Sequence, residues 1–475
     1  MYISKYNLYV RLDDHPDLAI IQNLFHGQAT LVPRILATYL EKSSPHGRLS
    51  DLGRGMVDML RRKGFVYDDR SDEDEQISAI YTEFKKSLPS ANPSRQYQLI
   101  LTYDCNLRCL YCFQKKVRRE AGPDILSRKQ LQRIFSIILE REAANDREVN
   151  ERNLPTRVPL ISIVGGEPLL DSPALRERIA TVVDFARDNG FHYSLTTNGV
   201  FLASYLSLFR SADYFPRDIQ VTIDGSREYH DRRRPGPGGA GSFDAIVQGI
   251  DRVLAEGERI SLRINIDAMN VSSIHEIADY ILEKGWSGHD MFSAYLAPVT
   301  DHSAVNQNYR WLQKDETLIR RIVEMFSERP ELEAVFTMKN FRGFQYVKRI
   351  VQNEGRSVPT LWRCEAVLGQ LVFDPRGNLY TCFEGAGNHA ARIGTYSPHY
   401  VIDEKRERAW KDLNAFTNRY CRHCRYRFVC SSGCPWHIVG QGATECLPIE
   451  KEIQLAWNYY APRVIGDGVE GRLCW

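Results

Sequence analysis

The chain has 475 residues, which at roughly 150 residues per domain predicts about three domains. Its 43% hydrophobic and 26% charged residues are typical of a globular protein and exclude long disorder, collagen-like repeats and fibrous coiled coils. The 62 Lys and Arg residues against 60 Asp and Glu leave a formal charge of +2, which gives no indication of a nucleic-acid or membrane partner.

The chain shows no sign of export. It has no run of about 18 apolar residues that would predict a membrane span. Residues 1–10 lack the basic flank, apolar stretch and cleavage site of a signal peptide. We therefore expect a cytoplasmic protein, in which the 11 cysteines indicate metal binding or catalysis more than disulfides.

Residues 1–92 are expected to form a small winged-helix-like unit. The apolar pattern predicts strands at 6–10 and 19–24, helices around 32–40 and 49–60, and a short strand at 65–67. The acidic run Asp68–Glu75 is interpreted as a solvated boundary.

Residues 93–310 alternate strands with helices. The predicted strands are 98–103, 160–164, 192–196, 219–223, 261–266 and 291–296, and helices are expected at 127–142, 173–189, 243–256 and 272–284. This repetition predicts an α/β fold with a parallel sheet or partial barrel, whose active site lies at the carboxyl ends of the strands. A bridging helical segment at 311–360 and a cysteine-rich domain at 361–475 are expected to follow.

Three cysteines follow the first strand of the predicted barrel. Cys105, Cys109 and Cys112 form a CxxxCxxC pattern, with Tyr111 before the last cysteine. Three thiolates at this spacing suit three corners of an iron–sulfur cube and leave one iron open to a ligand that is not protein. The alternatives are a zinc site, which usually has a fourth protein ligand, and cysteines that only pack.

The CxxxCxxC pattern resembles that of the radical SAM superfamily. The resemblance implies a partial (β/α)6, TIM-like barrel with a [4Fe-4S] cluster on the three cysteines. It also implies that S-adenosylmethionine chelates the open iron and is cleaved to a 5′-deoxyadenosyl radical, which abstracts a substrate hydrogen. An electron donor such as flavodoxin or ferredoxin would supply the reducing electron.

A glycine-rich turn ends the second strand of the predicted barrel. Gly165, Gly166, Glu167 and Pro168 resemble the GGEP motif of the same family, which contacts the amino group of S-adenosylmethionine. Glycine lets the backbone approach a ligand closely, and proline fixes the turn. Without the cysteine triplet, the same four residues would indicate only a turn.

Later strands of the predicted barrel carry polar residues at the same edge. Asn198 follows the third strand, Asp224 follows the fourth, and Arg263 lies on the fifth. We predict that Asn198 and Arg263 bind the cofactor and that Asp224 is a candidate catalytic base; hydrogen bonding that only supports the strand ends is the alternative. The basic, glycine-rich segment Arg232–Gly241 lacks the Lys-Ser/Thr of a P-loop and is interpreted as a flexible loop beside the site.

Seven more cysteines lie between residues 364 and 446, spaced C-x12-G-x4-C, then C-x2-C-x5-C-x3-C, then a last cysteine. This spacing resembles the SPASM domain of radical SAM enzymes; a rubredoxin-like or zinc-ribbon site is the alternative. The resemblance implies two auxiliary [4Fe-4S] clusters and so three clusters in all. By the ligand order of the family, one would be held by Cys421, Cys424, Cys430 and Cys446, and the other by Cys364, Cys382 and Cys434.

The second auxiliary set is one ligand short. Cys474, a non-cysteine group such as His437, water and a substrate thiolate are the alternatives for the missing place. We favour an open site or a ligand from elsewhere in the chain.

Three clusters and an added N-terminal unit resemble the peptide-modifying members of the family, which recognise the leader of a precursor peptide by adding it as a strand to a sheet edge. We therefore expect a maturase that oxidatively crosslinks a ribosomally made peptide or small cysteine-containing protein through a thioether or carbon–carbon bond. Maturases of the quinohemoprotein amine dehydrogenase small subunit have a comparable architecture. Alternatively, the N-terminal unit only caps the barrel.

Three other functions stay open. Anaerobic sulfatase maturases, which make formylglycine, place an aspartate directly after the cysteine that matches Cys382. This chain has Phe383 there, followed by Glu384, which is a second candidate base. A dehydrogenase of a small molecule and an iron–sulfur electron carrier are the remaining alternatives, although the carrier would need neither GGEP nor an open iron.

Overall fold

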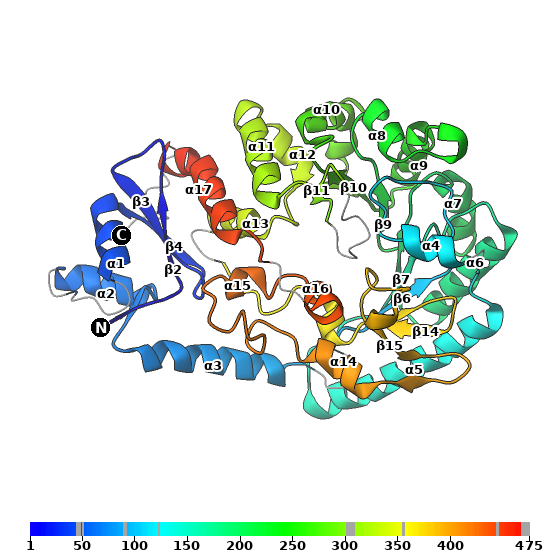
Figure 1. Cartoon of the computed structure of the whole chain (residues 1–475), viewed down its shortest axis with the longest axis horizontal. Helices are drawn as coiled ribbons and strands as arrows, with labels where there is room; N and C mark the ends of the chain where they lie inside the picture. The colour runs from blue at the N-terminus through cyan, green and yellow to red at the C-terminus, as the bar shows by residue number, and fades with distance from the viewer. Residues whose placement is uncertain are drawn as a thin grey trace.

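A computed structural model describes residues 1–43, 49, 52–88, 93–121, 124–300, 309–353, 357–442 and 446–466. Along its longest axis lie an N-terminal unit, a middle region built largely from C-terminal elements, and a barrel (Figure 1). No helix in the described ranges has the length and apolar character needed to cross a membrane.

The N-terminal unit contains two small antiparallel sheets and three helices. One sheet has the order β2-β3-β4, and in the other β1 pairs with β5. The elements are β1 (Tyr2–Ile3), β2 (Asn7–Arg11), β3 (Leu18–Asn23), β4 (Gln28–Pro33), α1 (Arg34–Ser43), α2 (Arg54–Arg62), β5 (Val66–Tyr67) and α3 (Arg70–Lys86).

Two sequence expectations for this unit were wrong. Residue Val32 lies in strand β4, opposite Ala19 of β3, and not in a helix; pairing in the sheet outweighs the helical spacing of the apolar residues. The acidic run is exposed over most of its length, as expected, but it starts helix α3 and is therefore not a boundary. Asp69 caps this helix and forms a capping box with Asp72, while Glu73 is buried and accepts a hydrogen bond from Ser4 Oγ.

The barrel confirms all six predicted strands, each within three residues at either end. They are β6 (Gln96–Ile100), β7 (Leu160–Val164), β8 (His192–Thr196), β9 (Ile219–Thr222), β10 (Ile260–Ile266) and β11 (Phe292–Pro298), followed by β12 (Phe336–Thr337). Neighbouring strands are parallel, in sequence order. Their apolar side chains are almost fully buried, as expected for a parallel sheet covered by helices.

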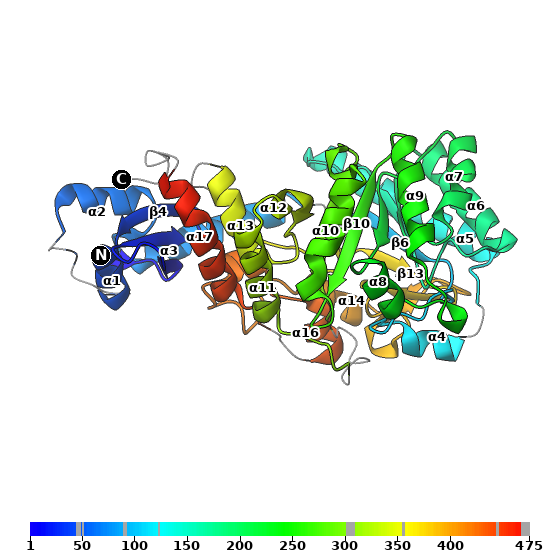
Figure 2. The same cartoon turned by 90° about the horizontal axis from the view of Figure 1, so that it is seen from above.

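Helices connect the strands and lie outside the sheet (Figure 2). They are α4 (Lys115–Ala121), α5 (Arg128–Arg152), α6 (Pro173–Asp188), α7 (Leu202–Ser211), α8 (Arg227–Arg233), η2 (Pro237–Gly239), α9 (Phe243–Ala255), η3 (Val271–Ser273), α10 (Ile274–Glu283) and η4 (Trp286–Gly288). The bridging segment contains α11 (Asp315–Glu328), α12 (Leu332–Val335) and α13 (Arg342–Gln352).

The cysteine-rich region continues the sheet of the barrel. Strand β13 pairs in parallel with β6, and β14, β15 and β16 follow as antiparallel neighbours. The barrel and this region therefore share one 11-stranded sheet. The elements are η5 (Glu365–Leu368), β13 (Leu371–Phe373), β14 (Asn378–Tyr380), η6 (His389–Ala391), β15 (Arg392–Thr395), β16 (Val401–Ile402), α14 (Glu404–Lys411), α15 (Arg427–Cys430), α16 (Pro435–Gln441) and α17 (Ile449–Gly466).

The N-terminal unit is fixed to the molecule through helix α17, which lies between it and α13 and α11 (Figure 2). Trp457 of α17 is fully buried and donates from Nε1 to Gln22 Oε1 at 2.7 Å. Phe428 packs against the rings of Tyr6 and Phe25. These contacts join the N-terminal unit to α15 and α17.

Replacing Trp457 with Ala tests this attachment. We expect a loss of about 3–5 kcal/mol of unfolding free energy, because a large buried side chain is removed and Gln22 loses its partner. Chemical denaturation and limited proteolysis of the N-terminal unit measure the effect. Asn458→Ala, which removes two exposed hydrogen bonds with Asp13, is the matched control; equal stability of the two variants would contradict the account.

Candidate active site and cysteine clusters

The loop of Cys105, Cys109 and Cys112 starts at the carboxyl end of β6, where the sequence predicts it. Two backbone hydrogen bonds fix the loop to the segment after α8: Arg108 N donates to Pro235 O at 2.8 Å, and Leu110 N donates to Arg233 O at 3.0 Å. The loop is therefore held from both sides, by its own strand and by the connection after β9.

The three thiols lie close enough to influence one another's ionisation. Burial raises the pKa of Cys105 to about 12, with further contributions from Glu167 and Cys109, and burial raises the pKa of Cys109 to about 11. Leu107 N points at Cys105 Sγ, 3.4 Å away. Thiols in such a group become thiolate ligands when cationic metal is bound, and N–H donors directed at sulfur are a feature of iron–sulfur sites.

The glycines of the GGEP turn pack against the cysteine loop. Gly166 N donates to Thr102 O at 2.9 Å, and Glu167 N donates to Asp104 O at 2.8 Å. A Cβ atom on Gly166 would lie 2.2 Å from Asp104 O. Glycine is thus required at position 166 because the backbone of the GGEP turn packs directly against the backbone of the cysteine loop. The sequence predicts glycine there for the close approach of a ligand.

Glu167 joins the GGEP turn to the end of β8. Its carboxylate accepts hydrogen bonds from Thr197 Oγ1 at 2.6 Å, Asn198 N at 2.6 Å and Leu169 N at 2.8 Å. Asn198 in turn donates from Nδ2 to Asn106 Oδ1 at 2.7 Å. The structure therefore brings Gly165, Gly166, Glu167, Pro168 and Asn198 together beside Cys105, where they could hold S-adenosylmethionine.

The hydroxyl of Tyr111 is the centre of a buried network behind the cysteine loop. It donates to Asp224 Oδ2 at 2.5 Å and accepts from Arg234 Nη1 at 2.7 Å and Asn265 Nδ2 at 2.8 Å. Arg263 of β10 donates to Asn265 Oδ1 at 2.7 Å. The end of β9, the end of β10 and the cysteine loop thus meet at one side chain.

The carboxylate of Asp224 is fully buried and faces guanidinium groups. Burial opposes its ionisation, but the charges of Arg233 and Arg234 outweigh this effect and hold the pKa of Asp224 below its ordinary value. Arg233 Nε lies 3.5 Å from Asp224 Oδ2, and Arg233 Nη1 lies 2.6 Å from Asp267 Oδ2. A carboxylate with these partners is a weak proton acceptor, so the geometry favours a positioning role for Asp224.

The segment Arg232–Gly241 is not simply the flexible loop that the sequence predicts. The side chains of Arg233 and Arg234 are buried, and the carbonyls of Arg233 and Pro235 accept hydrogen bonds from the cysteine loop. His230 is also buried; its Nδ1 accepts from Asp224 N at 3.2 Å. Asp231 accepts from Ser242 N and Phe243 N at the start of α9.

The C-terminal cysteines lie in two groups. Cys421 interacts electrostatically with Cys424, Cys430 and Cys446, while Cys382 interacts with Cys364 and Cys434. Cys474 lies outside the described residues. These interactions place the cysteines of each predicted set near one another, and the ligand sets themselves stay a prediction from spacing.

Backbone N–H groups point at several of these sulfurs, as they do at Cys105. Ala366 donates to Cys364, Gly385 to Cys382 and His437 to Cys434. Gly377, the glycine of the C-x12-G-x4-C spacing, has φ +83° in the turn between β13 and β14, where its Cβ would lie 2.5 Å from Ser397 O. Thiols that face backbone N–H groups are suited to iron–sulfur clusters. Gly377 shapes the turn that leads to Cys382.

The group of Cys364, Cys382 and Cys434 adjoins the Cys105–Cys112 loop. The ring of Phe113, next to Cys112, contacts that of Phe383, next to Cys382, at a centroid distance of 5.3 Å. Glu384 interacts electrostatically with Arg263 of β10 and with His437 of α16. Burial raises the pKa of Glu384 to about 7 although both of these groups oppose the rise. Glu384 thus lies between the barrel and this cysteine group.

Comparison with known proteins identifies the barrel. The sequence profile of the Radical SAM superfamily matches residues 99–281, which include the cysteine triplet and GGEP. The barrel is therefore a Radical SAM domain, and the chain is an enzyme. A Radical SAM domain implies a [4Fe-4S] cluster and S-adenosylmethionine.

Several relatives of this radical SAM enzyme are maturases. It is 25% identical over 399 residues to the mycofactocin maturase MftC of Mycobacterium tuberculosis, covering 78% of this chain and 88% of the relative. It is 22% identical over 345 residues to the serine-type anaerobic sulfatase-maturating enzyme of Klebsiella aerogenes, covering 71% and 78%.

Solved structures share the fold of this radical SAM enzyme. Native anSMEcpe with bound AdoMet and Kp18Cys peptide has a TM-score of 0.56 at 17% identity, over 78% of this chain and 98% of that chain. SuiB of Streptococcus suis bound to precursor peptide SuiA has a TM-score of 0.50 at 13% identity, over 92% and 96%.

Asp224→Asn distinguishes a positioning role from a catalytic base in this enzyme. Asn cannot neutralise Arg233 and Arg234, and breaking a buried ion pair costs about 3–5 kcal/mol. We expect substrate-independent cleavage of S-adenosylmethionine, measured as 5′-deoxyadenosine, to fall together with substrate modification. Asp244→Asn breaks only an exposed ion pair with Arg227 and is the control. Normal cleavage with loss of modification alone would indicate a base.

Proposed function

We propose that this radical SAM enzyme is a maturase that oxidatively crosslinks a ribosomally made peptide or small cysteine-containing protein, through a thioether or a carbon–carbon bond. One observation supports this proposal most strongly. The group of Cys364, Cys382 and Cys434 lies beside the Cys105–Cys112 loop, because Phe113 contacts Phe383. Such a crosslink removes two electrons from the substrate, and a cluster at this group would lie where it could accept one.

In this proposal Cys105, Cys109 and Cys112 hold the radical-generating cluster. The four-cysteine and three-cysteine groups hold two auxiliary clusters, so that three [4Fe-4S] clusters are present. When bound, S-adenosylmethionine supplies a 5′-deoxyadenosyl radical that removes a hydrogen atom from the substrate. Gly165–Pro168, Asn198 and Arg263 position this cofactor, and Glu384 is the candidate group for accepting the substrate proton.

Mass spectrometry of the substrate tests the reaction class. The genes beside this one are searched for small cysteine-bearing proteins, and each of these is co-expressed anaerobically with the enzyme as the probe. We expect a loss of two hydrogens per crosslink with all sulfur retained, because one hydrogen leaves as an atom and the other as a proton and an electron. The Cys105→Ala, Cys109→Ala, Cys112→Ala variant is the control; an unchanged mass with active wild type would contradict the proposal.

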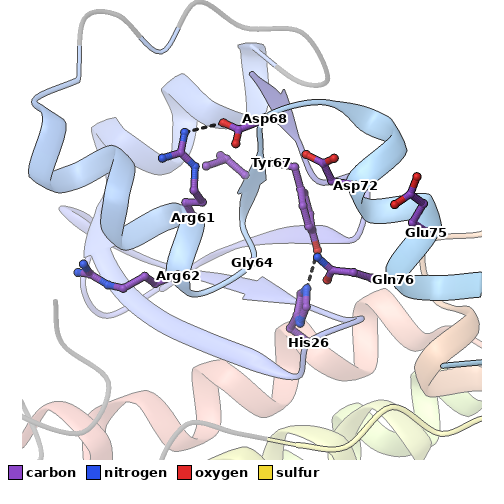
Figure 3. Close-up of a pocket in the computed structure, with 10 residues that line it drawn as sticks. His26, Arg61, Arg62, Gly64, Tyr67, Asp68, Asp72, Glu75 and Gln76 are labelled. Atoms are coloured by element: carbon purple, nitrogen blue, oxygen red, sulfur yellow. Dashed lines mark hydrogen bonds and ion pairs between the residues drawn. The ribbon is translucent and has the colours of Figure 1, made fainter. Parts of the chain in front are cut away.

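The N-terminal unit offers a groove for a peptide. A cavity of about 520 Å³ lies between the β5 strand, the end of α2 and the first turns of α3. Its lining includes the backbone at Gly64 and Val66, the ion pair of Arg61 with Asp68, and acidic side chains of α3 (Figure 3). Within the described residues, β5 pairs on one side only, with β1. We propose that the leader of the precursor peptide adds to this strand, and the presence of precursor peptides among the related structures supports it.

Filling the groove tests leader recognition. Gln76 lines the groove from α3, whereas Ser78 is exposed on the same helix but does not line it. We expect Gln76→Trp to weaken peptide binding about tenfold or more, roughly 1.4 kcal/mol, and Ser78→Trp to leave it unchanged. Fluorescence anisotropy measures the affinity, and both variants should retain substrate-independent cleavage of S-adenosylmethionine. Equal peptide affinities of the two variants would contradict leader binding in this groove and favour the alternative that the N-terminal unit only caps the barrel.

A second candidate function is the formation of formylglycine. The likeness to the sulfatase-maturating enzyme supports it, and Glu384 lies one position beyond the aspartate of those enzymes. Conversion of a cysteine to formylglycine removes sulfur and creates an aldehyde. The same mass spectrum, with a hydrazide probe for the aldehyde, therefore separates the two functions. We also propose a cytoplasmic location and a flavodoxin or ferredoxin as electron donor, because oxygen-sensitive clusters need a reducing compartment.

A further inference from the structure

Two arginines lie between the two C-terminal cysteine groups. Arg342 belongs to α13 of the bridging segment, outside the cysteine-rich region. Its guanidinium donates from Nη1 to the carbonyl of Cys430 and from Nη2 to the carbonyl of Gly433 at 3.4 Å. Cys430 belongs to the four-cysteine group, and Gly433 precedes Cys434 of the three-cysteine group. One side chain thus holds the short segment that contributes to both groups.

Arg363 reaches the same place from another part of the chain. It directly precedes Cys364 of the three-cysteine group and interacts electrostatically with Cys430 of the four-cysteine group. Its segment is tied to α15 because Thr360 N donates to Phe428 O at 2.8 Å and Ser431 Oγ donates to Thr360 O at 2.8 Å. Arg363 therefore also lies between the two groups.

The guanidinium of Arg363 lacks acceptors in the described part of the chain. Its Nε and Nη2 atoms are inaccessible to solvent and form no hydrogen bond there. Neither Arg342 nor Arg363 forms an ion pair with a carboxylate among the described residues. The nearby acid, Glu452, uses its Oε2 atom to accept from Gly343 N at 2.6 Å, and burial raises the pKa of Glu452 to about 7.

Two half-buried cations without a carboxylate ion pair are unfavourable unless an anion compensates them. A cluster ligated by thiolates is such an anion, and its sulfurs accept N–H hydrogen bonds. Two observations indicate that clusters compensate these charges. Arg363 has N–H groups without partners in the described part of the chain, and Arg342 donates to the carbonyls of Cys430 and Gly433.

We propose that Arg342 and Arg363 are positioning residues that bind electrostatically to both auxiliary clusters and raise their reduction potentials. The proposal rests on the auxiliary clusters of the proposed function. Reduction adds one negative charge to a cluster, so a buried positive charge beside it stabilises the reduced state. The two arginines would thereby make the C-terminal clusters better electron acceptors.

Redox titration followed by electron paramagnetic resonance tests the role of the arginines. The full chain carries Cys105→Ala, Cys109→Ala and Cys112→Ala, so that only the auxiliary clusters contribute to the signal. To this background we add Arg363→Gln, which removes the charge, or Arg363→Lys, which retains it. Arg408→Gln, an exposed site on α14, is the matched control. Iron content is measured for every variant.

We expect Arg363→Gln to shift the reduction equilibrium of at least one auxiliary cluster tenfold or more toward the oxidised state, which for one electron is about 59 mV. Arg363→Lys retains the positive charge and should have a reduction potential close to that of the background protein. Loss of iron in the Gln variant but not in the Lys variant would also support the role of the charge. An unchanged potential in Arg363→Gln, or equal iron loss in both variants, would overturn it. Absence of auxiliary iron from the background protein itself would instead refute the proposed clusters.

Discussion

The position of the radical-generating loop depends on the buried hydroxyl of Tyr111. This group donates to Asp224 and accepts from Arg234 and Asn265, so the cysteine loop is fixed to the ends of β9 and β10. The carboxylates of Asp224 and Asp267 balance the charges of Arg233 and Arg234, which permits their burial. A cluster must be held at a defined distance from its substrate, and a buried network of this kind provides rigidity.

The second constraint is the continuity of the sheet. Because β13 pairs with β6 and β14 returns beside β13, the chain that leads to Cys382 belongs to the same sheet as the strand before the radical-generating cysteines. The side chains after the two sets of cysteines also meet, since Phe113 contacts Phe383. On the far side of the cysteine groups, α15 and α17 carry the N-terminal unit. A peptide bound there would be connected to the barrel through the cysteine-rich region.

Much of the barrel could be predicted from the sequence, because buried parallel strands are continuous apolar runs. The grouping of the cysteines into ligand sets stays a prediction from their local spacing. Strand β4 could not be predicted, since its pairing with β3 is a tertiary contact that local periodicity does not encode. The partners of Asp224 were missed for the same reason: Tyr111, Arg234 and Asn265 lie far apart along the chain. The GGEP glycines were recognised, but their packing against Thr102 and Asp104 depends on two neighbouring strand ends.

The central claim is that ten cysteines hold three separate clusters, and metal analysis of the anaerobically reconstituted chain tests it most directly. Iron and zinc should be measured in the wild type and in three variants, each with one cysteine group replaced by Ala. The account predicts iron for three clusters in the wild type and the loss of one cluster's iron in each variant. Stoichiometric zinc in the C-terminal groups, or unchanged iron after replacement of any group, would contradict it.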